Sequence, residues 1–260
     1  MRLDRWEYKQ TDWDAHVDQL LHEGNFDNEY QMSPRAHGKL VRILDPILQR
    51  VEYNSPGSEP ILVEHIIGLG LRVVEGGTID DNRHMFGLSR PALYPAFNDY
   101  LYTVNTAPEL DIFLPATDAE WYDANCGWQS KTTHGIMGGM VMAVDGSFQG
   151  TAMPTRKEVA NRPAYFSGHY QGYRMNCIAG IYSNLQFGCF GVTAPGSTKD
   201  VISWPMAASL KRACDNLPLG LYMVADAAFP ISEHMLVPYT GADRLDVDRD
   251  AFNYYVLSKS

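Results

Sequence analysis

The sequence has no closely paired cysteines and no long apolar run. Its four cysteines, Cys126, Cys177, Cys189 and Cys214, include no C-x-x-C pair, so a structural zinc site is not expected. The first residues are charged rather than apolar, so we expect no secretory signal and no disulfide framework. No apolar stretch reaches the roughly 18–20 residues that a membrane-spanning helix needs. These absences predict an intracellular protein with four reduced, mostly buried thiols that is neither secreted nor inserted in a membrane.

Several common catalytic motifs are absent as well. There is no G-x-S-x-G phrase for a nucleophilic serine. The glycine-rich stretch 134–139 precedes a strand-like run and opens no helix, so it does not match a dinucleotide-binding loop. His169 and His234 are expected to be surface or hydrogen-bonded side chains rather than metal ligands.

Positive charge is scarce in the first half of the chain. The net charge is −10, and residues 1–130 carry 10 basic and 21 acidic side chains, whereas residues 131–260 carry 11 and 10. Phosphate contacts rely on Lys and Arg, so the acidic half argues against a chain that coats nucleic acid. Only residues 146–214, with seven basic and two acidic side chains, are expected to face a polyanion such as DNA.

The first half reads as an acidic extension followed by helices. Residues 1–57 are polar with scattered apolar anchors, and residues 54–58 have the composition of a linker. The apolar run 61–74 predicts a buried helix, Thr78 is a good N-cap for a second, and Ser89 for a third. Pro95 should kink or displace that third helix. The order resembles a helix-turn-helix, although such short helices are more often plain packing units and this one looks like a poor reader of DNA.

The second half alternates strands and helices. Apolar runs at 137–144, 173–182, 187–192 and 219–224 predict strands, and the second and third form a hairpin. Residues 200–213 have helical spacing, with Pro205 expected to bend or split the helix. Strands followed by a helix and another strand predict an α/β or α+β layer.

Two aspartates stand at similar places in this pattern. Asp145 follows the run 139–144, and Asp226 follows the run 221–225, so both are expected at strand ends. If the two strands are neighbours, the carboxylates converge and favour a hard divalent ion, Mg²⁺ or Mn²⁺, which can act on a phosphodiester. The alternative is that each aspartate merely starts a turn, which is common for Asp-Gly pairs.

Several ordered segments resemble the PIF/Harbinger group of DDE transposases and the nuclease-like proteins derived from them. The resemblance runs from about residue 60 to the last residue. Its segments are 69–79 with 85–90, Gly138-Gly-Met-Val-Met-Ala-Val-Asp-Gly-Ser147, Tyr173-Arg-Met-Asn176, Ala194-Pro-Gly-Ser-Thr-Lys-Asp200, Asp226-Ala-Ala-Phe-Pro-Ile231 with 236–239, and Phe252-Asn-Tyr-Tyr255.

The resemblance implies roles for individual residues. Asp145 and Asp226 match the first and second catalytic, metal-binding aspartates, and Asp200 and Lys199 match a supporting turn in which the family usually has His before the Asp. In the family a third acid follows the phrase at 252–255, and we expect the chain to stop before that position. The acids at 243–250 are expected to form a solvated loop that lacks the Gly and the final acid of a calcium loop. A metal site with two acids predicts weak or absent cleavage.

We therefore predict an α/β fold with an RNase H-like nuclease core that is incomplete at its C-terminus. It would occupy residues 135–260, after a helix-turn-helix-like segment at 58–116 and an acidic extension at 1–57. The expected function is that of a transposon-derived DDE-type endonuclease domain using Mg²⁺ or Mn²⁺ on DNA. The alternative is a catalytically dead transposase remnant that binds DNA or protein, as a homo-oligomer or with a partner protein. A nuclear rather than cytoplasmic location follows only from the resemblance.

Overall fold

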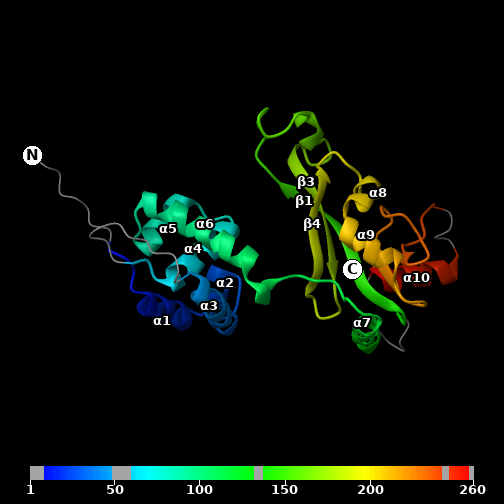
Figure 1. The fold of residues 1–260 in the computed structure, drawn as a ribbon, viewed down its shortest axis with the longest axis horizontal. Helices are drawn as coiled ribbons and strands as arrows, with labels where there is room; N and C mark the ends of the chain where they lie inside the picture. Colours follow the sequence, from blue (N-terminus) through cyan, green and yellow to red (C-terminus); the bar gives the residue numbers. More distant parts are fainter. Residues whose placement is uncertain (1–8, 49–59, 132–136, 242–245, 258–260) are drawn as a thin grey trace, which may run out of the picture. The chain divides into compact units, whose positions relative to one another are not determined.

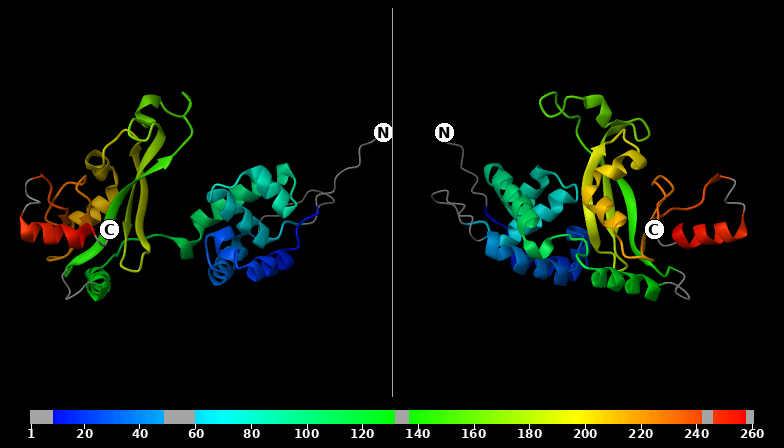
Figure 2. Two further views of the ribbon diagram at one scale, coloured as in Figure 1. Left: turned by 180° about the vertical axis from the view of Figure 1, so that it is seen from behind. Right: turned by 45° about the vertical axis from the view of Figure 1, so that its right-hand side comes forward.

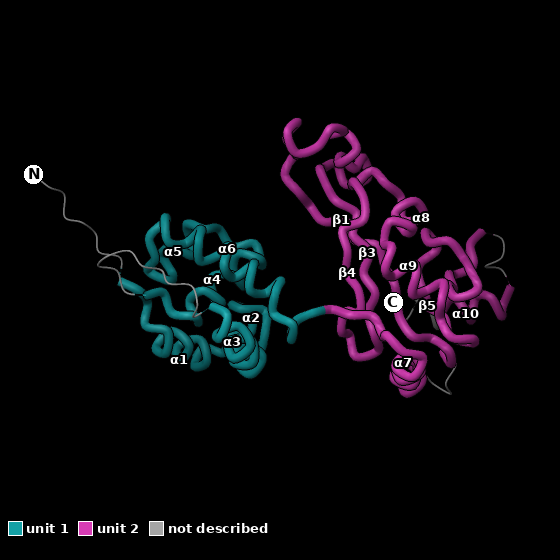
Figure 3. Tube along the Cα trace, in the orientation of Figure 1, with its two compact units in different colours: residues 1–111 teal, residues 112–260 magenta. Residues whose placement is uncertain are grey.

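The chain folds into two separate units. The computed structural model describes residues 9–48, 60–131, 137–241 and 246–257. Contacts divide the chain into unit 1, residues 1–111, and unit 2, residues 112–260 (Figure 3). Every helix in the described ranges is too short or too polar to span a lipid bilayer.

Unit 1 is helical. Its helices are α1 (Trp13–Glu23), α2 (Phe26–Tyr30), α3 (Pro34–Leu48), α4 (Val63–Val74), α5 (Ile79–Phe86) and α6 (Arg90–Thr106), followed by a short 3₁₀ turn, η1 (Pro108–Leu110) (Figure 1). Local signals set several ends. Asp12 caps α1 by accepting a hydrogen bond from the Ala15 N–H, and Gly24 ends that helix with a positive φ of 66°.

The predicted helices of residues 61–107 are confirmed, with differences at Ser89 and Pro95. Thr78 caps α5 by accepting a hydrogen bond from the Asp81 N–H, and Gly87 ends α5 in the left-handed conformation. Ser89 precedes α6 without a side-chain capping bond. Helix α6 continues through Pro95 as one element, so the expected displacement of the helix there is wrong. Proline removes only one intrahelical donor, and the buried neighbours Leu93 and Ala96 hold this segment in the core.

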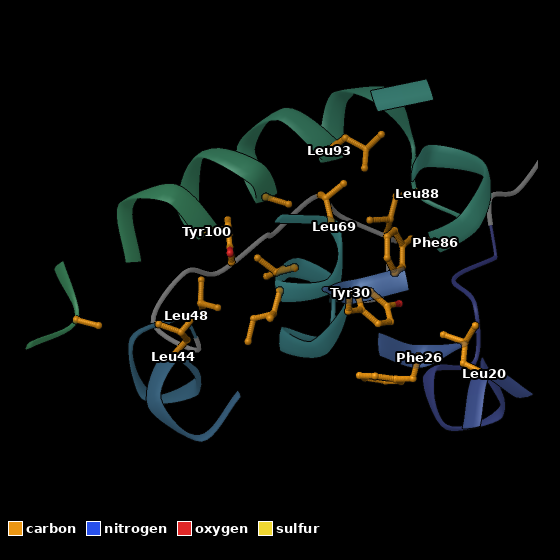
Figure 4. Close-up of a cluster of buried hydrophobic side chains, with 14 residues drawn as sticks. Leu20, Phe26, Tyr30, Leu44, Leu48, Leu69, Phe86, Leu88, Leu93 and Tyr100 are labelled. Atoms are coloured by element: carbon orange, nitrogen blue, oxygen red, sulfur yellow. The ribbon is translucent and has the colours of Figure 1, made fainter. Parts of the chain in front are cut away.

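One buried cluster joins helices α1 to α6 in the described part of unit 1 (Figure 4). Leu20, Phe26 and Tyr30 from α1 and α2, with the leucines of α3, pack with apolar side chains of α4 to α6. The fully buried members of this cluster include Tyr30, Leu44, Leu48, Ile66, Ile67, Leu69, Phe86 and Leu93. The acidic segment expected as a separate extension at 1–57 therefore shares a core with the helices after it, and the unit boundary lies at residues 111 and 112. The linker expected at 54–58 lies outside the described residues.

Burial holds three histidines of unit 1 in their neutral form. Desolvation lowers the pKa of His37 and of His65 from its usual value. It also lowers the pKa of His16, where the positive charge of Arg72 adds to the effect. His37 and His65 pack around the Trp13 ring, and a ring nitrogen of His16 lies 2.9 Å from the Tyr30 hydroxyl. Protonation of these side chains is therefore opposed by the folded state.

We expect unit 1 to lose stability as the pH falls below about 6.5. The unfolded chain takes up protons on its histidines near that pH, whereas the folded chain resists. The stability is fully present above the unfolded pKa and declines toward the lower folded pKa, by at most about 1.4 kcal/mol per pH unit for each histidine. Urea unfolding followed at pH 7.5 and 5.5 measures this, and His37→Leu should reduce the pH dependence while the exposed control His22→Gln keeps it. Equal unfolding free energies at both pH values would contradict the prediction.

Unit 2 is a mixed α/β layer. Its elements are α7 (Asp118–Lys131), β1 (Met140–Gly150), η3 (Arg162–Tyr165), β2 (Phe166–Ser167), β3 (Gly172–Ile181), β4 (Phe187–Pro195), α8 (Asp200–Ser203), η4 (Trp204–Met206), α9 (Ala208–Asp215), β5 (Tyr222–Ala225), β6 (Met235–Leu236) and α10 (Val247–Leu257). In the described ranges the sheet has the order β2-β3-β1-β5-β6, and β4 pairs with β3. Strands β1, β3 and β4 are antiparallel and lie side by side in the views of Figure 2, whereas β5 runs parallel to β1 and β6. The predicted hairpin, β3 with β4, and the split of the following helix at Pro205 are confirmed.

The two faces of this sheet pack against α9 and α10 respectively, and α7 contributes a tryptophan to each cluster. On one face, here called the α9 face, Val144 of β1 packs in a cluster with Leu210 and Cys214 of α9. On the other, here called the α10 face, Ala143 packs in a cluster with Trp128 of α7 and Phe252 of α10. Since side chains alternate between faces along a strand, these clusters assign the positions of β1 from Met142 onward to one face or the other, beyond the irregular register between Met140 and Met142.

Asn253, a buried residue of α10, forms two hydrogen bonds with the backbone of Tyr239, which follows β6. The Tyr239 N–H donates to Asn253 Oδ1 at 2.7 Å, and Asn253 Nδ2 donates to the Tyr239 carbonyl oxygen at 2.9 Å. The Phe252 and Tyr239 rings lie 5.5 Å apart. The segment 252–255 lies within α10, which begins at Val247.

Replacing Asn253 by alanine is expected to destabilise unit 2 by about 2–4 kcal/mol, because both backbone groups of Tyr239 lose their partner. Asn253→Asp keeps the acceptor oxygen but sets a buried carboxylate against the Tyr239 carbonyl oxygen, so it should cost at least as much. Denaturant unfolding of the full chain measures both, with the exposed Val247→Ala as control. An alanine variant as stable as the original chain would show that these bonds do not hold α10.

Candidate active site

Asp145 lies inside a strand rather than at its end. Strand β1 continues to Gly150, and its residues from Ala143 onward pair with β3. Pairing with β5 ends earlier, at Val144 opposite Ala225. The expectation that the strand ends at Asp145 is wrong, as is the alternative that this residue starts a turn, because β3 supplies a partner strand that the local sequence does not reveal. Asp145 is instead the first β1 residue beyond the β5 pairing.

Asp226 stands at the matching position of the neighbouring strand. It follows Ala225 directly, as Asp145 follows Val144, and the strands are parallel. Val224 packs on the α10 face and Ala225 on the α9 face. Alternation along β1 therefore directs Asp145 to the α10 face, and the same alternation, continued one residue beyond the end of β5 at Ala225, directs Asp226 there as well. Neighbouring strands lie about 4.8 Å apart, so the backbones of these two positions are neighbours, and the charge of Asp226 acts on the Asp145 carboxyl. Asp226 also opens a turn, since its Oδ1 accepts a hydrogen bond from the Ala228 N–H at 3.0 Å.

The pKa of Asp145 reflects its partial desolvation and the nearby negative charges. Both aspartates are exposed residues. Partial desolvation raises the pKa of the Asp145 carboxyl, and the negative charges of Asp226 and Asp200 raise it further, against a hydrogen bond from the Gly146 N–H. Like charges held together favour a cation between them.

Asp200 lies behind this pair, on the α9 face. Its Oδ1 accepts a hydrogen bond from Asn176 Nδ2 at 2.9 Å, and Asn176 is a buried side chain of β3 that also donates to the Thr198 carbonyl. The Asp200 carboxylate covers Gly146, where a Cβ atom would meet Oδ1 at 2.7 Å. Lys199 is exposed, and its carbonyl accepts the first backbone bonds of α8. The structure therefore places Asp200 against the backbone next to Asp145, on the other side of the sheet.

The donor atoms at the pair suit a hard divalent cation. Carboxylate oxygens are the ligands that Mg²⁺ and Mn²⁺ prefer, and Mg²⁺ is commonly held by one or two carboxylates with water and substrate phosphate completing its shell. Across the described ranges, no group of three or more His, Cys, Asp or Glu side chains is placed to hold a metal ion. The fit is that of a two-carboxylate site.

The acids near the end of the chain do not form the expected solvated loop. Asp246 Oδ1 accepts hydrogen bonds from the N–H groups of Asp248 and Arg249, and Asp248 and Asp250 lie in the first turn of α10. Acidic side chains stabilise that end of a helix, so these residues help to start α10. Asp243 lies outside the described residues.

The remaining histidines and the cysteines considered in the sequence have contacts that are expected of structural residues. His234 Nδ1 lies 2.9 Å from the Leu221 carbonyl oxygen, and the His169 ring packs edge-on against Tyr170. All four cysteines are free, as predicted, and Cys177 and Cys214 are buried. The glycine-rich stretch at 134–139 lies partly outside the described residues.

Two supporting residues escaped the sequence analysis. Gly146 received no role beyond the alternative of an Asp-Gly turn, whereas it provides the space that the Asp200 carboxylate fills. Asn176 was part of a matched segment but received no role. The available signal was a polar amide within the apolar run 173–182, since a buried amide needs hydrogen-bond partners.

Two carboxylates at matched positions on one face of a mixed sheet define a candidate metal-dependent site for phosphate chemistry. Residues 144–259 match the family model of the DDE superfamily endonucleases, and this range begins one residue before Asp145 and includes Asp226. Neither the curated proteins nor the solved structures provide a match. The match supports a nuclease-like DDE domain in unit 2.

Proposed function

We propose that unit 2 is a transposon-derived, DDE-type endonuclease domain of the PIF/Harbinger kind, with an RNase H-like core. Its substrate would be a DNA phosphodiester, and its catalytic residues Asp145 and Asp226. The observation that supports this most is the matched position of the two aspartates on parallel neighbouring strands, both on the α10 face.

The two carboxylates would hold Mg²⁺ or Mn²⁺ and the reacting phosphate in a fixed relation. A bound divalent ion supplies an activated water and neutralises charge that develops on the phosphate. Asp145 projects from a paired strand, and Asp226 directly follows one and is held in a turn by the Ala228 N–H, which limits the movement of both. Asp200, held by Asn176, would act as a positioning residue by fixing the β1 backbone at Gly146. Lys199 would attract the DNA backbone from the basic range 146–214.

Cleavage by this two-carboxylate site is proposed to be weak. DDE chemistry relies on three acids according to the resemblance stated above, and none of the described residues adds a third ligand to the pair. The same observation favours a second candidate function, a DNA- or protein-binding module without cleavage, acting in the nucleus as a homo-oligomer or with a partner protein. In either case the helices of unit 1 would serve as a helix-turn-helix-like accessory segment.

A nicking assay separates the two candidates. Supercoiled DNA is incubated with the full chain and Mn²⁺, Mg²⁺ or EDTA, beside the Asp226→Asn variant. Slow nicking that requires the metal and Asp226 supports the endonuclease. Salt-dependent DNA binding without nicking supports the binding module. Absence of both would refute a role on DNA.

A further inference from the structure

The sheet row that contains Asp145 ends in an exposed aromatic ring. Asp145 pairs with Ala179 of β3, and Ala179 pairs with Phe190 of β4. Directly paired residues point to the same face of a sheet, so Asp145, Ala179 and Phe190 form a row on the α10 face. Two strand spacings, about 10 Å, separate the first from the last. The small side chain of Ala179 leaves the row open between them.

Phe190 belongs to a larger exposed group on β4. Phe187, Phe190 and Val192, here called the β4 patch, are 52%, 49% and 59% exposed. They pair with Ile181, Ala179 and Cys177 of β3, which places all three on the α10 face. The Phe187 and Phe190 rings lie 6.3 Å apart, nearly perpendicular to each other. Exposed aromatic groups of this kind mark binding surfaces more often than isolated apolar residues do.

The chemistry around the β4 patch suits a flat, uncharged ring. On the α10 face the neighbouring β1 positions after Asp145 are Ser147 and Gln149, which carry hydrogen-bonding groups without charge. No lysine or arginine occupies an α10-face position of β1, β3 or β4 between Ala143 and Val192. The cation bound by Asp145 and Asp226 would therefore be the positive charge that holds a phosphate on this face. A base on the same strand would then reach Phe190.

We propose that Phe190, supported by Phe187, stacks a nucleobase of the DNA strand whose phosphodiester lies at Asp145 and Asp226. This inference rests on the proposed function, because the acid pair supplies the reason for a nucleic acid at this face. A strand of B-DNA advances about 10 Å in three nucleotides, which equals the separation of Asp145 and Phe190. A base within three nucleotides of the reacting phosphate can therefore reach Phe190. Bases within a duplex are already stacked on each other, so the preferred substrate is single-stranded or locally opened DNA.

The test compares oligonucleotides with and without bases. Fluorescence anisotropy follows binding of a labelled oligothymidine, and of an abasic strand with the same phosphates, to the full chain carrying Asp226→Asn, so that no cleavage intervenes. Base stacking on an aromatic side chain contributes enough for Phe190→Ala to weaken oligothymidine binding by about 5- to 100-fold. Binding of the abasic strand should not change. Phe190→Tyr should retain affinity, whereas Phe190→Leu should lose it, since leucine keeps apolar area but offers no π-face.

A control substitution and a check of folding distinguish the loss of base stacking from a general loss of structure. Leu219→Ala, an exposed residue outside the β4 patch, should leave binding unchanged, and melting curves verify that each variant is folded. The proposal is overturned if Phe190→Leu binds as tightly as the parent, if the abasic strand binds equally well, or if oligothymidine does not bind. Self-association lost in Phe190→Leu without any effect on oligothymidine would instead make the patch a protein interface. A Mn²⁺-induced melting shift with Asp226 intact tests the proposed function separately, because it does not depend on Phe190.

Discussion

Replacing Asp145 or Asp226 by asparagine is expected to stabilise the metal-free protein and to abolish its stabilisation by Mn²⁺. The pKa of Asp145 is raised above its ordinary value by desolvation and by the charges of Asp226 and Asp200. Ionisation at neutral pH therefore costs free energy in the folded state, a cost that disappears below the ordinary carboxyl pKa, and a neutral amide removes it. A cation that binds only the folded protein raises its melting temperature, and this gain requires both carboxylates.

Differential scanning fluorimetry with EDTA and with a Mn²⁺ series measures the two effects on the same samples. Metal-dependent DNA cleavage, where it occurs, should fall at least about 100-fold in either variant, because losing a ligand exceeds the effect of losing a supporting residue. Asp123→Asn, an exposed change on α7, is the matched control and should alter neither property. An asparagine variant that keeps the Mn²⁺ shift, or is less stable than the parent without metal, would contradict the paired-carboxylate site.

Replacing Gly146 by alanine is expected to destabilise unit 2 by about 1–3 kcal/mol, because the new Cβ atom would meet the Asp200 carboxylate at 2.7 Å. The Mn²⁺ response should also weaken, since the adjustment displaces β1 next to Asp145. In an Asp200→Ala background the same substitution has space and should cost far less. Urea unfolding of the four proteins gives a coupling energy, expected to be about 0.5–3 kcal/mol. Strictly additive effects would show that Asp200 does not constrain the strand at Gly146.

Local signals in the sequence predicted much of the fold. Thr78 predicted the start of α5, Pro205 predicted the split of the helix after β4, and the apolar runs 173–182 and 187–192 predicted the hairpin of β3 and β4. Each of these features depends on neighbours in the chain, so the sequence carries the information directly.

Features that depend on distant partners were predicted less well. Asp145-Gly146 is a turn signal by itself, yet pairing with β3 continues β1 through it. The anchors of residues 13–48 were visible, but the helices after Ile61 that complete their core are remote in sequence. For the site, two similar strand patterns predicted matched positions for Asp145 and Asp226, and the parallel pairing of β1 with β5 provides those positions. The position of Asp200 behind the sheet depends on the register of β3 and on Asn176, which no spacing reveals.

The account depends on Asp145 and Asp226 sharing one divalent cation on the α10 face. The most direct measurement is an anomalous difference map from crystals of the full chain grown with Mn²⁺. We expect one strong peak within bonding distance of carboxylate oxygens from both residues. A map without a peak between them, or with Mn²⁺ bound only elsewhere, would contradict the account.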